Sequence, residues 1–336
     1  MKYIRKKLIK GSEYYYFEFA FRTLAGDKIV FTRYLGKALP SDIKNKIRTF
    51  FEEISGIAIK RLDEKIISYF PPNGTNKIER ARAWYHYLNH ELCEKEFKLF
   101  KDLFVVLFVL NSNRAEGSRV TRDDIEKIIN KRRKPRTKLD KEIVNSFDAL
   151  NFAFSKKMKW NASSVKKIHK ILFNGIDDEI AGKYKKENVI VGAGGIASIT
   201  TPKEKVRLEM RKLMAWLNSM RKKAYAPILA LKFHWKFEQI HPFQDGNGRV
   251  GRILFNALLL DNFFMPVIFF NENHIAYSNA IAKAIEGRES KIAKYFIEQL
   301  AKTQRRVEEY KKEGRIKGGS SSVGKWEIQY GRIRVY

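Results

Sequence analysis

HPFQDGNGRVGR, at residues 241–252, is the stretch on which the expected fold and chemistry depend. It places an imidazole, a carboxylate, two loop glycines and two arginines next to one another. Glycines can turn successive backbone N–H groups toward one anion, and arginine can bind phosphate oxygens in a bidentate manner. This combination is typical of a catalytic site that handles phosphate.

Helices are expected on both sides of this stretch. Residues 226–240 have the pattern of a helix that ends just before His241, because Pro242 disfavours helical geometry at the residue before it. The loop 244–248 leads to a second helix, whose N-terminus is a further favourable position for phosphate. The apolar stripe of that second helix consists of Val250, Ile253, Leu254, Ala257 and Leu258.

Residue type and position suggest the chemical roles. On the second helix Arg249, Arg252 and Asn256 are spaced at i, i+3 and i+7, so they share another face of the helix. A histidine has an ordinary pKa of about 6.5, so His241 can take a proton from an attacking hydroxyl near neutral pH. Asp245 supplies the hard oxygen that a Mg²⁺ ion bridging phosphates prefers.

The composition indicates a folded and strongly basic protein. Its 336 residues include 67 Lys and Arg against 37 Asp and Glu, a formal charge of +30. Such a chain attracts polyanions, although a solvated lysine-rich surface accounts for the same charge equally well. Cys93 is the only cysteine, no secretory signal is visible, and the most apolar run, 103–110, is too short to span a bilayer. We expect a cytoplasmic protein with no membrane partner.

Residues 1–95 are expected to form an accessory module. The expected strands are 3–10, 13–23 and 28–35, separated by glycine-containing turns. In the middle strand aromatic residues alternate with period two, which fits a packed sheet, with a nucleic-acid stacking surface as the alternative. A long helix over 41–70 and a second helix from residue 76 follow.

From residue 97 to residue 308 the apolar pattern is almost entirely helical. The exception is a β-hairpin expected over 189–199, where apolar residues flank three glycines. Thr201 is expected to cap the next helix, with Pro202 at its first position. Residues 309–336 form a basic tail that could end in one short strand.

The stretch 241–252 resembles the signature of the Fic family, His-Pro-Phe-x-Asp/Glu-Gly-Asn-Gly-Arg-x-x-Arg, and matches it at every defined position. The resemblance extends over about residues 97–308. It implies a mainly α fold, the Fic helical bundle with a β-hairpin flap, to which residues 1–95 add a small antiparallel sheet and helices. An inactive copy of such a domain is the main alternative.

The resemblance implies transfer of AMP from ATP to a Ser, Thr or Tyr hydroxyl of a target protein, with release of pyrophosphate and with self-modification as a side reaction. His241 would be the general base, Asp245 the Mg²⁺ ligand and Phe243 a core anchor for the loop. The α-phosphate ligands would be Gly246, Asn247 and Gly248, and those of the β- and γ-phosphates Arg249 and Arg252. The family branch that phosphorylates its targets carries lysine at the position of Gly248, so nucleotide transfer is favoured over kinase activity.

A second signature lies upstream. The run SNRAEG, from Ser112 to Gly117, resembles the inhibitory motif of Fic proteins whose inhibitory helix, here around 103–117, precedes the catalytic core. Glu116 would neutralise Arg252 and block its place at the γ-phosphate. In the family the same glutamate can also orient water for removal of AMP. A structural alternative treats Glu116 as an ordinary helix-end acid followed by a glycine C-cap.

The resemblance also suggests how base and target are bound. Tyr277 and Asn256 lie where relatives contact the adenine or the ribose. The hairpin would clamp the target peptide through main-chain hydrogen bonds. Its target-binding residues would be Val189, Ile190, Val191, Ile196 and Ile199. His169 and His234 are expected as core or helix-capping residues rather than ligands.

The sequence leaves two other functions open beside an autoinhibited adenylyltransferase. One is a deAMPylating enzyme that uses Glu116. The other is a nucleic-acid-binding regulator whose Fic domain senses nucleotide while the basic N-terminal module docks on DNA or RNA. A homodimer is expected by analogy with relatives. Neither the target protein nor a preference for ATP over other nucleotides follows from the sequence.

Overall fold

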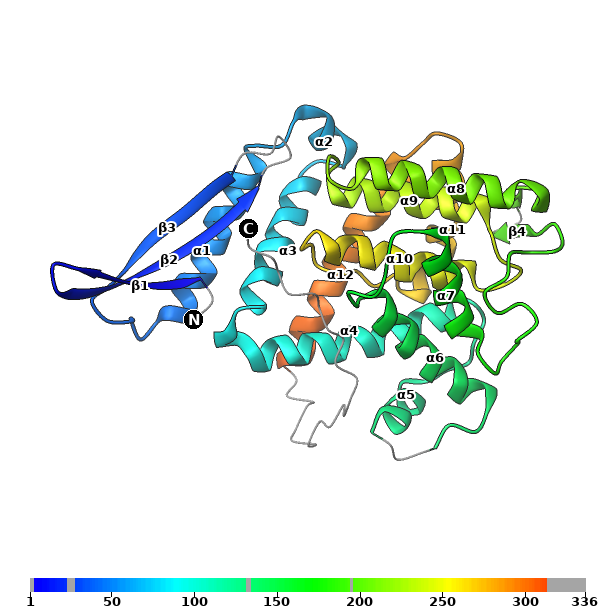
Figure 1. Ribbon diagram of the computed structural model, residues 1–336, viewed down its shortest axis with the longest axis horizontal. Coiled ribbons are helices and arrows are strands. Elements are labelled where there is room, and N and C mark those ends of the chain that lie inside the picture. Colours follow the sequence, from blue (N-terminus) through cyan, green and yellow to red (C-terminus); the bar gives the residue numbers. More distant parts are fainter. Residues whose placement is uncertain (1–2, 23–27, 131–133, 194–195, 313–336) are drawn as a thin grey trace.

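The computed structural model describes residues 3–22, 28–130, 134–193 and 196–312. It shows a mainly helical molecule with a three-stranded sheet at one end (Figure 1), as the sequence predicts. The tail after residue 312, with its predicted strand, lies outside the described residues, as does the centre of the basic run at 131–133. No helix in the described part combines the length and the apolar character that a membrane span needs.

The N-terminal sheet forms within one residue of each predicted strand end. Its antiparallel strands, adjacent in chain order, are β1 (Ile4–Ile9), β2 (Ser12–Arg22) and β3 (Lys28–Gly36). In the register of the sheet Ile4 lies opposite Phe17, and Phe19 lies opposite Phe31. All four side chains are buried in a small core shared with helix α1 (Ile43–Ile59).

The prediction of one long helix over 41–70 is wrong, because the chain forms two helices there. After α1 comes α2 (Glu64–Tyr69), whose N-cap is Asp63. The Asp63 side chain accepts a hydrogen bond of 2.9 Å from the N–H of Ile66, and its extended backbone starts a new helix. The next helix, α3 (Gly74–Leu88), begins two residues earlier than predicted.

Helix α3 belongs to both parts of the molecule. Its Ala83 packs in the small core under the sheet, whereas Tyr85 and Leu88 pack in the main core of the bundle. The two cores are therefore joined through one rigid element. A separate module ending near residue 95 stays a prediction.

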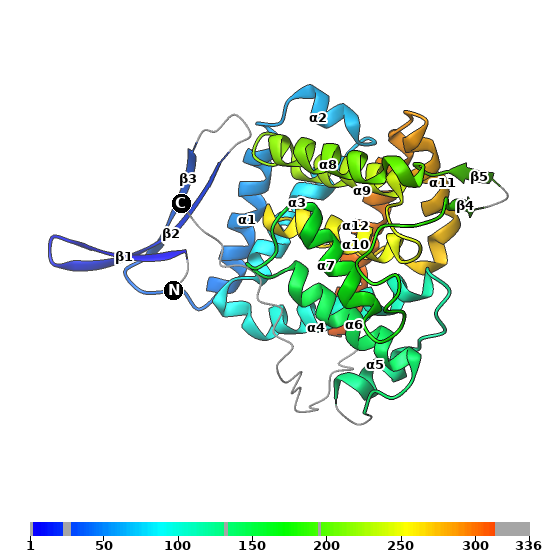
Figure 2. The same ribbon diagram turned by 45° about the vertical axis from the view of Figure 1, so that its right-hand side comes forward.

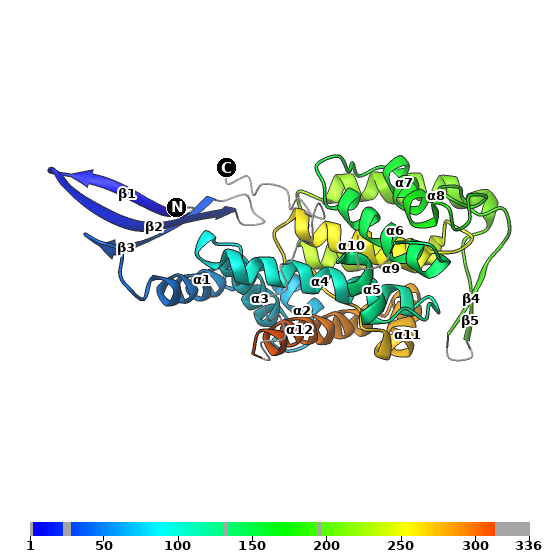
Figure 3. The ribbon, with the colours of Figure 1, turned by 90° about the horizontal axis from the view of Figure 1, so that it is seen from below.

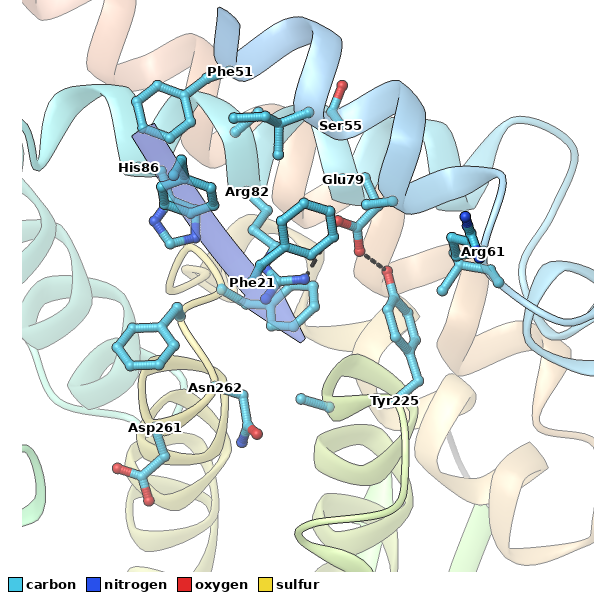
Figure 4. Close-up of a pocket in the computed structure, with 18 of the residues that line it drawn as sticks. Phe21, Phe51, Ser55, Arg61, Glu79, Arg82, His86, Tyr225, Asp261 and Asn262 are labelled. Atoms are coloured by element: carbon cyan, nitrogen blue, oxygen red, sulfur yellow. Dashed lines mark hydrogen bonds and ion pairs between the residues drawn. The ribbon is translucent and has the colours of Figure 1, made fainter. Parts of the chain in front are cut away.

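A cavity of about 540 Å³ lies where the sheet, α1 and α3 meet the bundle (Figure 4). Aromatic side chains such as Phe21 and Phe51 line it. On another wall the carboxylate of Glu79 accepts a hydrogen bond of 2.7 Å from the Tyr225 hydroxyl. This bond joins α3 to the residue that precedes α9 (Ala226–Ile240), and it fixes the sheet end of the molecule to the central helices.

The remaining helices form the bundle that carries the candidate site. They are the short turn Glu91–Cys93, α4 (Glu94–Arg114), α5 (Arg122–Ile129), α6 (Lys138–Ala153), α7 (Ala162–Phe173), α8 (Lys203–Met220), α10 (Asn247–Asp261), the turn Asn271–Asn273, α11 (His274–Ile285) and α12 (Ser290–Lys312). Figure 3 shows α9 and α10 between α7 and α8 on one side and α11 and α12 on the other. Every residue of α10 from 247 to 259 is buried, which makes it the central helix.

The predicted hairpin is present at the end of the molecule opposite the N-terminal sheet (Figure 2). Strands β4 (Ile190–Ala193) and β5 (Ile196–Ile199) pair in antiparallel fashion, and residues 194–195 at the tip lie outside the described residues. The sequence pattern therefore located this hairpin correctly.

The predicted N-cap of α8 is wrong. Pro202, not Thr201, is the N-cap residue, because the helix begins at Lys203. The N–H of Lys203 donates instead to the side-chain oxygen of Asn188 at 2.9 Å. The N–H of Thr201 donates to the carbonyl of Gln239 at 3.2 Å, so Thr201 attaches the end of the hairpin to α9.

We expect Phe17→Ala to lower the free energy of unfolding by about 3–5 kcal/mol, because it removes a fully buried ring from a small core. Val30→Ala is the matched control on the same sheet and should cost under about 0.5 kcal/mol, since Val30 is 55% exposed. Urea unfolding followed by circular dichroism measures both. A loss of less than about 1 kcal/mol in Phe17→Ala would show that this core contributes little to stability.

Candidate active site

The stretch 241–252 forms a tight loop at 241–246, between α9 and α10, and the first turns of α10. Helix α9 ends at Ile240, and His241 adopts a left-handed conformation, with φ 49° and ψ 62°, that turns the chain. Gly246 is the N-cap of α10 and has φ 78° and ψ 10°. A Cβ on Gly246 would lie 2.4 Å from a ring carbon of Phe173, so both conformation and space require glycine. The predicted helix, loop and helix are confirmed.

Asn247 closes this loop with its side chain. The side-chain oxygen accepts a hydrogen bond from the N–H of Phe243, and the side-chain nitrogen donates to the carbonyl of Phe243, both at 2.8 Å. Asn247 is buried. We predicted Asn247 as an α-phosphate ligand, but its side chain is committed to the loop, which leaves its backbone N–H in the first turn of α10 for an anion.

His169 supports the loop from α7. Its ring stacks on Phe243 and on Phe173, with centroids 3.9 Å and 4.6 Å apart. Nδ1 accepts a hydrogen bond from Gly182, so Nε2 carries the proton and donates to the carbonyl of Asp245; both distances are 2.9 Å. Burial lowers the pKa of His169 to about 4, which keeps the ring neutral. The structural role expected for His169 is confirmed.

His241 faces the loop as a neutral imidazole. Burial, together with the charge of Lys185, lowers its pKa to about 4. Nδ1 is buried and has no hydrogen-bond partner among the described residues, and Oε2 of Glu238 lies 3.9 Å from it. A neutral imidazole can accept a proton at physiological pH, as the predicted base must.

Lys185 connects the His241 loop to the hairpin, and sequence reasoning did not identify it as a site residue. Its Nζ donates to the Thr200 hydroxyl at 2.7 Å, and its backbone N–H donates to the carbonyl of Pro242 at 2.9 Å. The Thr200 hydroxyl in turn donates to the carbonyl of Val189 at 2.6 Å. Lys185 is only 5% exposed, and burial lowers its pKa. Nothing in the local sequence distinguishes this lysine from its solvated neighbours.

Residues at the C-terminal end of α4 and in the turn after it bind the guanidinium of Arg252. Its guanidinium donates to Oε1 of Glu116 at 2.8 Å, to the carbonyl of Ser112 at 2.9 Å and to the Ser112 hydroxyl at 3.1 Å. Arg252 is 3% exposed. Burial alone would raise the pKa of Glu116, but the charges of Arg252 and Arg249 outweigh burial and hold that pKa below its ordinary value. The predicted approach of Glu116 to Arg252 is therefore present as a charged pair.

Glu116 lies beyond the last turn of α4 rather than on the helix. Helix α4 begins at Glu94, nine residues before the helix expected around 103–117, and ends at Arg114, three residues before the expected end. Gly117 has φ 85°, and the N–H of Glu116 donates to the carbonyl of Asn113 at 3.0 Å. A left-handed glycine of this kind ends the helix and turns the chain, which directs the Glu116 carboxylate toward α10.

Two glycines of α10 leave room for carboxylates. A Cβ on Gly248 would lie 2.3 Å from Oε1 of Glu116, and a Cβ on Gly251 would lie 2.6 Å from Oε1 of Glu238. Both distances are shorter than real Cβ contacts, so even alanine would displace the carboxylate. Gly248 therefore makes the Glu116 contact possible.

A buried cluster of Glu238, His234 and Tyr277 lies behind α10. Burial raises the pKa of Glu238 to about 8, and burial with the charge of Arg252 lowers the pKa of His234 to about 3. Nε2 of His234 lies 2.9 Å from the Tyr277 hydroxyl, and Tyr277 is 8% exposed. The Tyr277 hydroxyl is thus engaged inside the protein, and its contact with a nucleotide stays a prediction.

Arg249 and Asp245 frame the open side of the loop. The Arg249 guanidinium lies 3.3 Å from Oδ2 of Asp245 and 4.8 Å from the centroid of the Phe173 ring. The Asp245 side chain is 57% exposed, and its Oδ1 accepts a hydrogen bond from Gly246. In the described ranges no three His, Cys, Asp or Glu side chains come together to hold a metal ion. A single open carboxylate still fits Mg²⁺, which commonly takes one or two carboxylates together with phosphate and water.

Asn256 does not face the loop, contrary to our prediction that it binds the nucleotide. Its side-chain nitrogen donates to the carbonyls of Arg252 and Val267 at 3.1 Å and 3.0 Å, and its oxygen accepts from the N–H of Val267 at 2.7 Å. The side chain is 1% exposed. Asn256 therefore holds the segment that follows α10, and the helix-face pattern could not show that this segment covers it.

The hairpin leaves apolar side chains in solvent. Ile190 is 68% exposed and Val191 is 37% exposed, while the carbonyl of Val189 is held by Thr200. The side chains of the remaining two predicted flap residues, Ile196 and Ile199, lie outside what the structure describes. A role of the hairpin in target binding stays a prediction.

The helical bundle, the loop between α9 and α10 and the hairpin beside it define a Fic-type domain. The fold is similar to that of a Fic-domain-containing signalling protein from Bacteroides thetaiotaomicron, with a TM-score of 0.63 and 20% identity, over 70% of this chain and 97% of that one. Fic-1 from C. elegans is similar over 81% of this chain and 84% of that one, with a TM-score of 0.62 and 18% identity. At these identities the likeness shows the fold alone.

Residues 159–259 match the model of the Fic/DOC family. The chain is also distantly similar to the protein adenylyltransferases Fic of Drosophila ananassae and Drosophila melanogaster, with 29% identity to each over 139 residues. That segment is 41% of this chain and 27% of each relative. The match therefore spans about a quarter of the length of these curated relatives.

Glu238 should make the stability of the fold depend on pH. Its pKa rises from 4.5 to about 8 on folding, so stability from the bound proton is present below pH 4.5 and is lost as pH rises through about 8. Glu238→Gln resembles the protonated form at every pH. We expect its melting temperature to rise relative to wild type between pH 5 and pH 8.5, by about 4 °C or more.

Differential scanning fluorimetry across this range measures the effect. Glu204→Gln, at an exposed position of α8, is the matched control and should differ from wild type by a constant amount. A constant difference for Glu238→Gln as well would mean that Glu238 is charged in the folded protein at neutral pH.

Proposed function

We propose that the chain is an autoinhibited protein adenylyltransferase, which transfers AMP from ATP to a hydroxyl side chain of a target protein. The observation that carries the proposal is the pair between Arg252 and Glu116. In this pair a carboxylate of the protein binds a buried guanidinium of α10 that an anionic ligand could otherwise bind. Similarity to protein adenylyltransferases over 139 residues supports the same chemistry.

The loop supplies the groups that such a transfer needs. His241 accepts the proton as the target hydroxyl attacks the α-phosphorus, and the bond from that phosphorus to the bridging oxygen breaks to release pyrophosphate. The backbone N–H groups of Asn247 and Gly248, in the first turn of α10, bind the α-phosphate, whereas the N–H of Gly246 donates to Oδ1 of Asp245. Arg249 and Arg252 neutralise the charge of the β- and γ-phosphates as it develops on the leaving group.

Asp245 is the residue that would hold Mg²⁺. The ion, when bound, neutralises phosphate charge and orients the phosphate chain. The Asp245 carboxylate is exposed at this loop, and the Arg249 guanidinium lies 3.3 Å from it. Arg249 could therefore contact a phosphate directly while Asp245 would hold the Mg²⁺ ion beside the same phosphate chain.

Glu116 explains why the wild-type enzyme would be weakly active. A γ-phosphate and the Glu116 carboxylate both require the Arg252 guanidinium, which is buried, and two anions held at one guanidinium repel each other. ATP bound beside Glu116 would hold its γ-phosphate elsewhere, so the α-phosphorus would not be aligned for attack. Ser112 also binds Arg252, which keeps the guanidinium in place when Glu116 leaves.

Glu116→Gly should raise self-labelling from α-labelled ATP with Mg²⁺ by about tenfold or more, because Arg252 becomes available to the γ-phosphate. Adding His241→Ala should abolish the signal, since the base is lost. Labelling of the purified chain, followed on a denaturing gel, measures both variants.

Glu116→Gln is the matched control, because it keeps the size of the side chain and removes the charge that pairs with Arg252. Its self-labelling should be stronger than that of wild type and weaker than that of Glu116→Gly. If Glu116→Gly binds ATP and labels nothing, the donor is another nucleotide or the chain is no transferase.

Asp245→Ala in the Glu116→Gly background should raise the Mg²⁺ concentration needed for half-maximal labelling by about tenfold or more, because the ion loses its carboxylate ligand. A Mg²⁺ titration of initial labelling rate measures this. An unchanged titration curve would show that another group holds the ion.

Removal of AMP is a second candidate function, favoured by the charged state of Glu116 beside the loop. A carboxylate there could orient water toward an AMP-modified hydroxyl instead of blocking Arg252. In that case Glu116→Gly abolishes hydrolysis of a modified target. The same variant therefore separates the two functions: it gains self-labelling if the chain is a transferase, and it loses hydrolysis of the modified target if the chain removes AMP.

A further inference from the structure

The N-terminal sheet has two faces of different character. Phe17, Phe19 and Phe31 are buried on the side of α1. Strand alternation and the pairing of Tyr16 with Tyr34 place these two tyrosines on the opposite side. In Figure 3 α1 lies along one side of the sheet, and no described element covers the other. In the described part of the chain, Tyr34 on this outer face is exposed to solvent, and Tyr14 and Tyr16 are partly exposed.

Three tyrosines, Tyr14, Tyr16 and Tyr34, form a tyrosine cluster on the outer face. The ring centroid of Tyr34 lies 6.2 Å from that of Tyr14 and 5.4 Å from that of Tyr16. The ring planes are tilted by 45° and 50°, so the rings do not stack on one another and can receive other planar groups. Tyr34 is 55% exposed, although a packed sheet core would not need an aromatic residue there.

Cationic side chains surround the tyrosine cluster, and one of them, Lys7, also pairs with Glu18 on the same face. Nζ of Lys7 lies 4.7 Å from the Tyr16 centroid, and Nζ of Lys37 lies 5.8 Å from the Tyr14 centroid. Arg5 lies opposite Tyr16 in the register of the sheet. The first 37 residues hold nine Lys and Arg against three Asp and Glu, so the positive charge is concentrated here as well as spread over the chain.

Exposed apolar surface is also concentrated on this sheet. Of the nine large hydrophobic side chains that are exposed in the described part of the chain, four lie on its strands. Ile9, Val30 and Tyr34 are on the outer face, whereas strand alternation places Leu8 on the face of Ile4. A patch of exposed apolar and aromatic side chains that is surrounded by charged side chains is typical of a binding surface.

We propose that the tyrosine cluster, with Arg5, Lys7 and Lys37, binds single-stranded nucleic acid. Bases can stack on tilted tyrosine rings in any sequence, and phosphates can lie along the three cations. A duplex hides the faces of its bases, so it could use the cations but not the rings. DNA and RNA single strands offer the same two chemical groups.

This surface is independent of the proposed transferase site. Helix α10 has its C-terminal end, at Asp261, beside the cavity under the sheet, and its N-terminal end at the catalytic loop. The sheet and the hairpin project from opposite ends of the molecule (Figure 1). Nucleic acid bound to the sheet would therefore leave the loop open to ATP and to a target.

The test uses fluorescence anisotropy of the full chain with labelled oligo-dT and oligo-U of about 15 nucleotides, so that DNA and RNA are separate arms. Tyr34→Ala should weaken binding of at least one oligonucleotide by about 5- to 100-fold, because a stacking platform is lost. The salt dependence should stay unchanged, because no charge is removed. Tyr34→Phe keeps the ring and should bind within about twofold of wild type.

Two further comparisons separate stacking from charge. Lys7→Gln should lower the slope of log affinity against log salt by about one, since one phosphate contact is lost. Inorganic polyphosphate has the charge but no bases, so Tyr34→Ala should bind it as wild type does. Self-labelling of Glu116→Gly should be unaffected by Tyr34→Ala, which also shows that the variant is folded.

The proposal is overturned if wild type binds neither oligonucleotide at low salt, or if Tyr34→Ala binds both as wild type does. Equal loss of polyphosphate and oligonucleotide binding, or stronger competition by a duplex than by a single strand, would also overturn it. Tyr34-dependent binding to anionic lipid vesicles without oligonucleotide binding would assign the face to a membrane surface. None of these results changes the labelling predicted for Glu116→Gly.

Discussion

The burial of two guanidinium groups on helix α10 is the constraint around which the Fic domain is arranged. A buried cation without an anion is strongly destabilising, so each arginine is matched by a carboxylate. Asp245 of the same loop matches Arg249, and Glu116, from the turn that follows α4, matches Arg252. The fold thus includes two anion positions whose protein carboxylates could be exchanged for the phosphates of a substrate. Such an exchange would keep an anion beside each buried guanidinium.

Local rules predicted the parts of the structure that depend on neighbouring residues. Pro242 ends α9, Gly246 starts α10, and the aromatic alternation in β2 gives the sheet to within one residue. The contact between Glu116 and Arg252 could be predicted although 136 residues separate them, because each residue lies in its own recognisable motif. This contact could be predicted only from the resemblance to a family, because the spacing of the two residues in the sequence does not indicate that they meet.

Sequence reasoning failed where a polar side chain is committed to a distant backbone. Asn247 and Asn256 share a helix with the arginines, yet their amides bind Phe243 and Val267. Nothing in the helical period shows which segment will cover a given face. Lys185 was missed for the same reason, because its burial depends on Thr200 and on the loop that it supports. The ends of α4 and α8 were misplaced by residues whose tertiary contacts override the usual capping preferences.

The competition between Glu116 and a γ-phosphate for Arg252 is the central claim, and isothermal titration calorimetry with a non-hydrolysable ATP analogue and with AMP tests it most directly. Glu116→Gln should bind the ATP analogue about tenfold or more tightly than wild type, whereas the affinity for AMP should change by less than about twofold. Equal affinity of both proteins for the ATP analogue, or an equal gain for AMP, would contradict the claim.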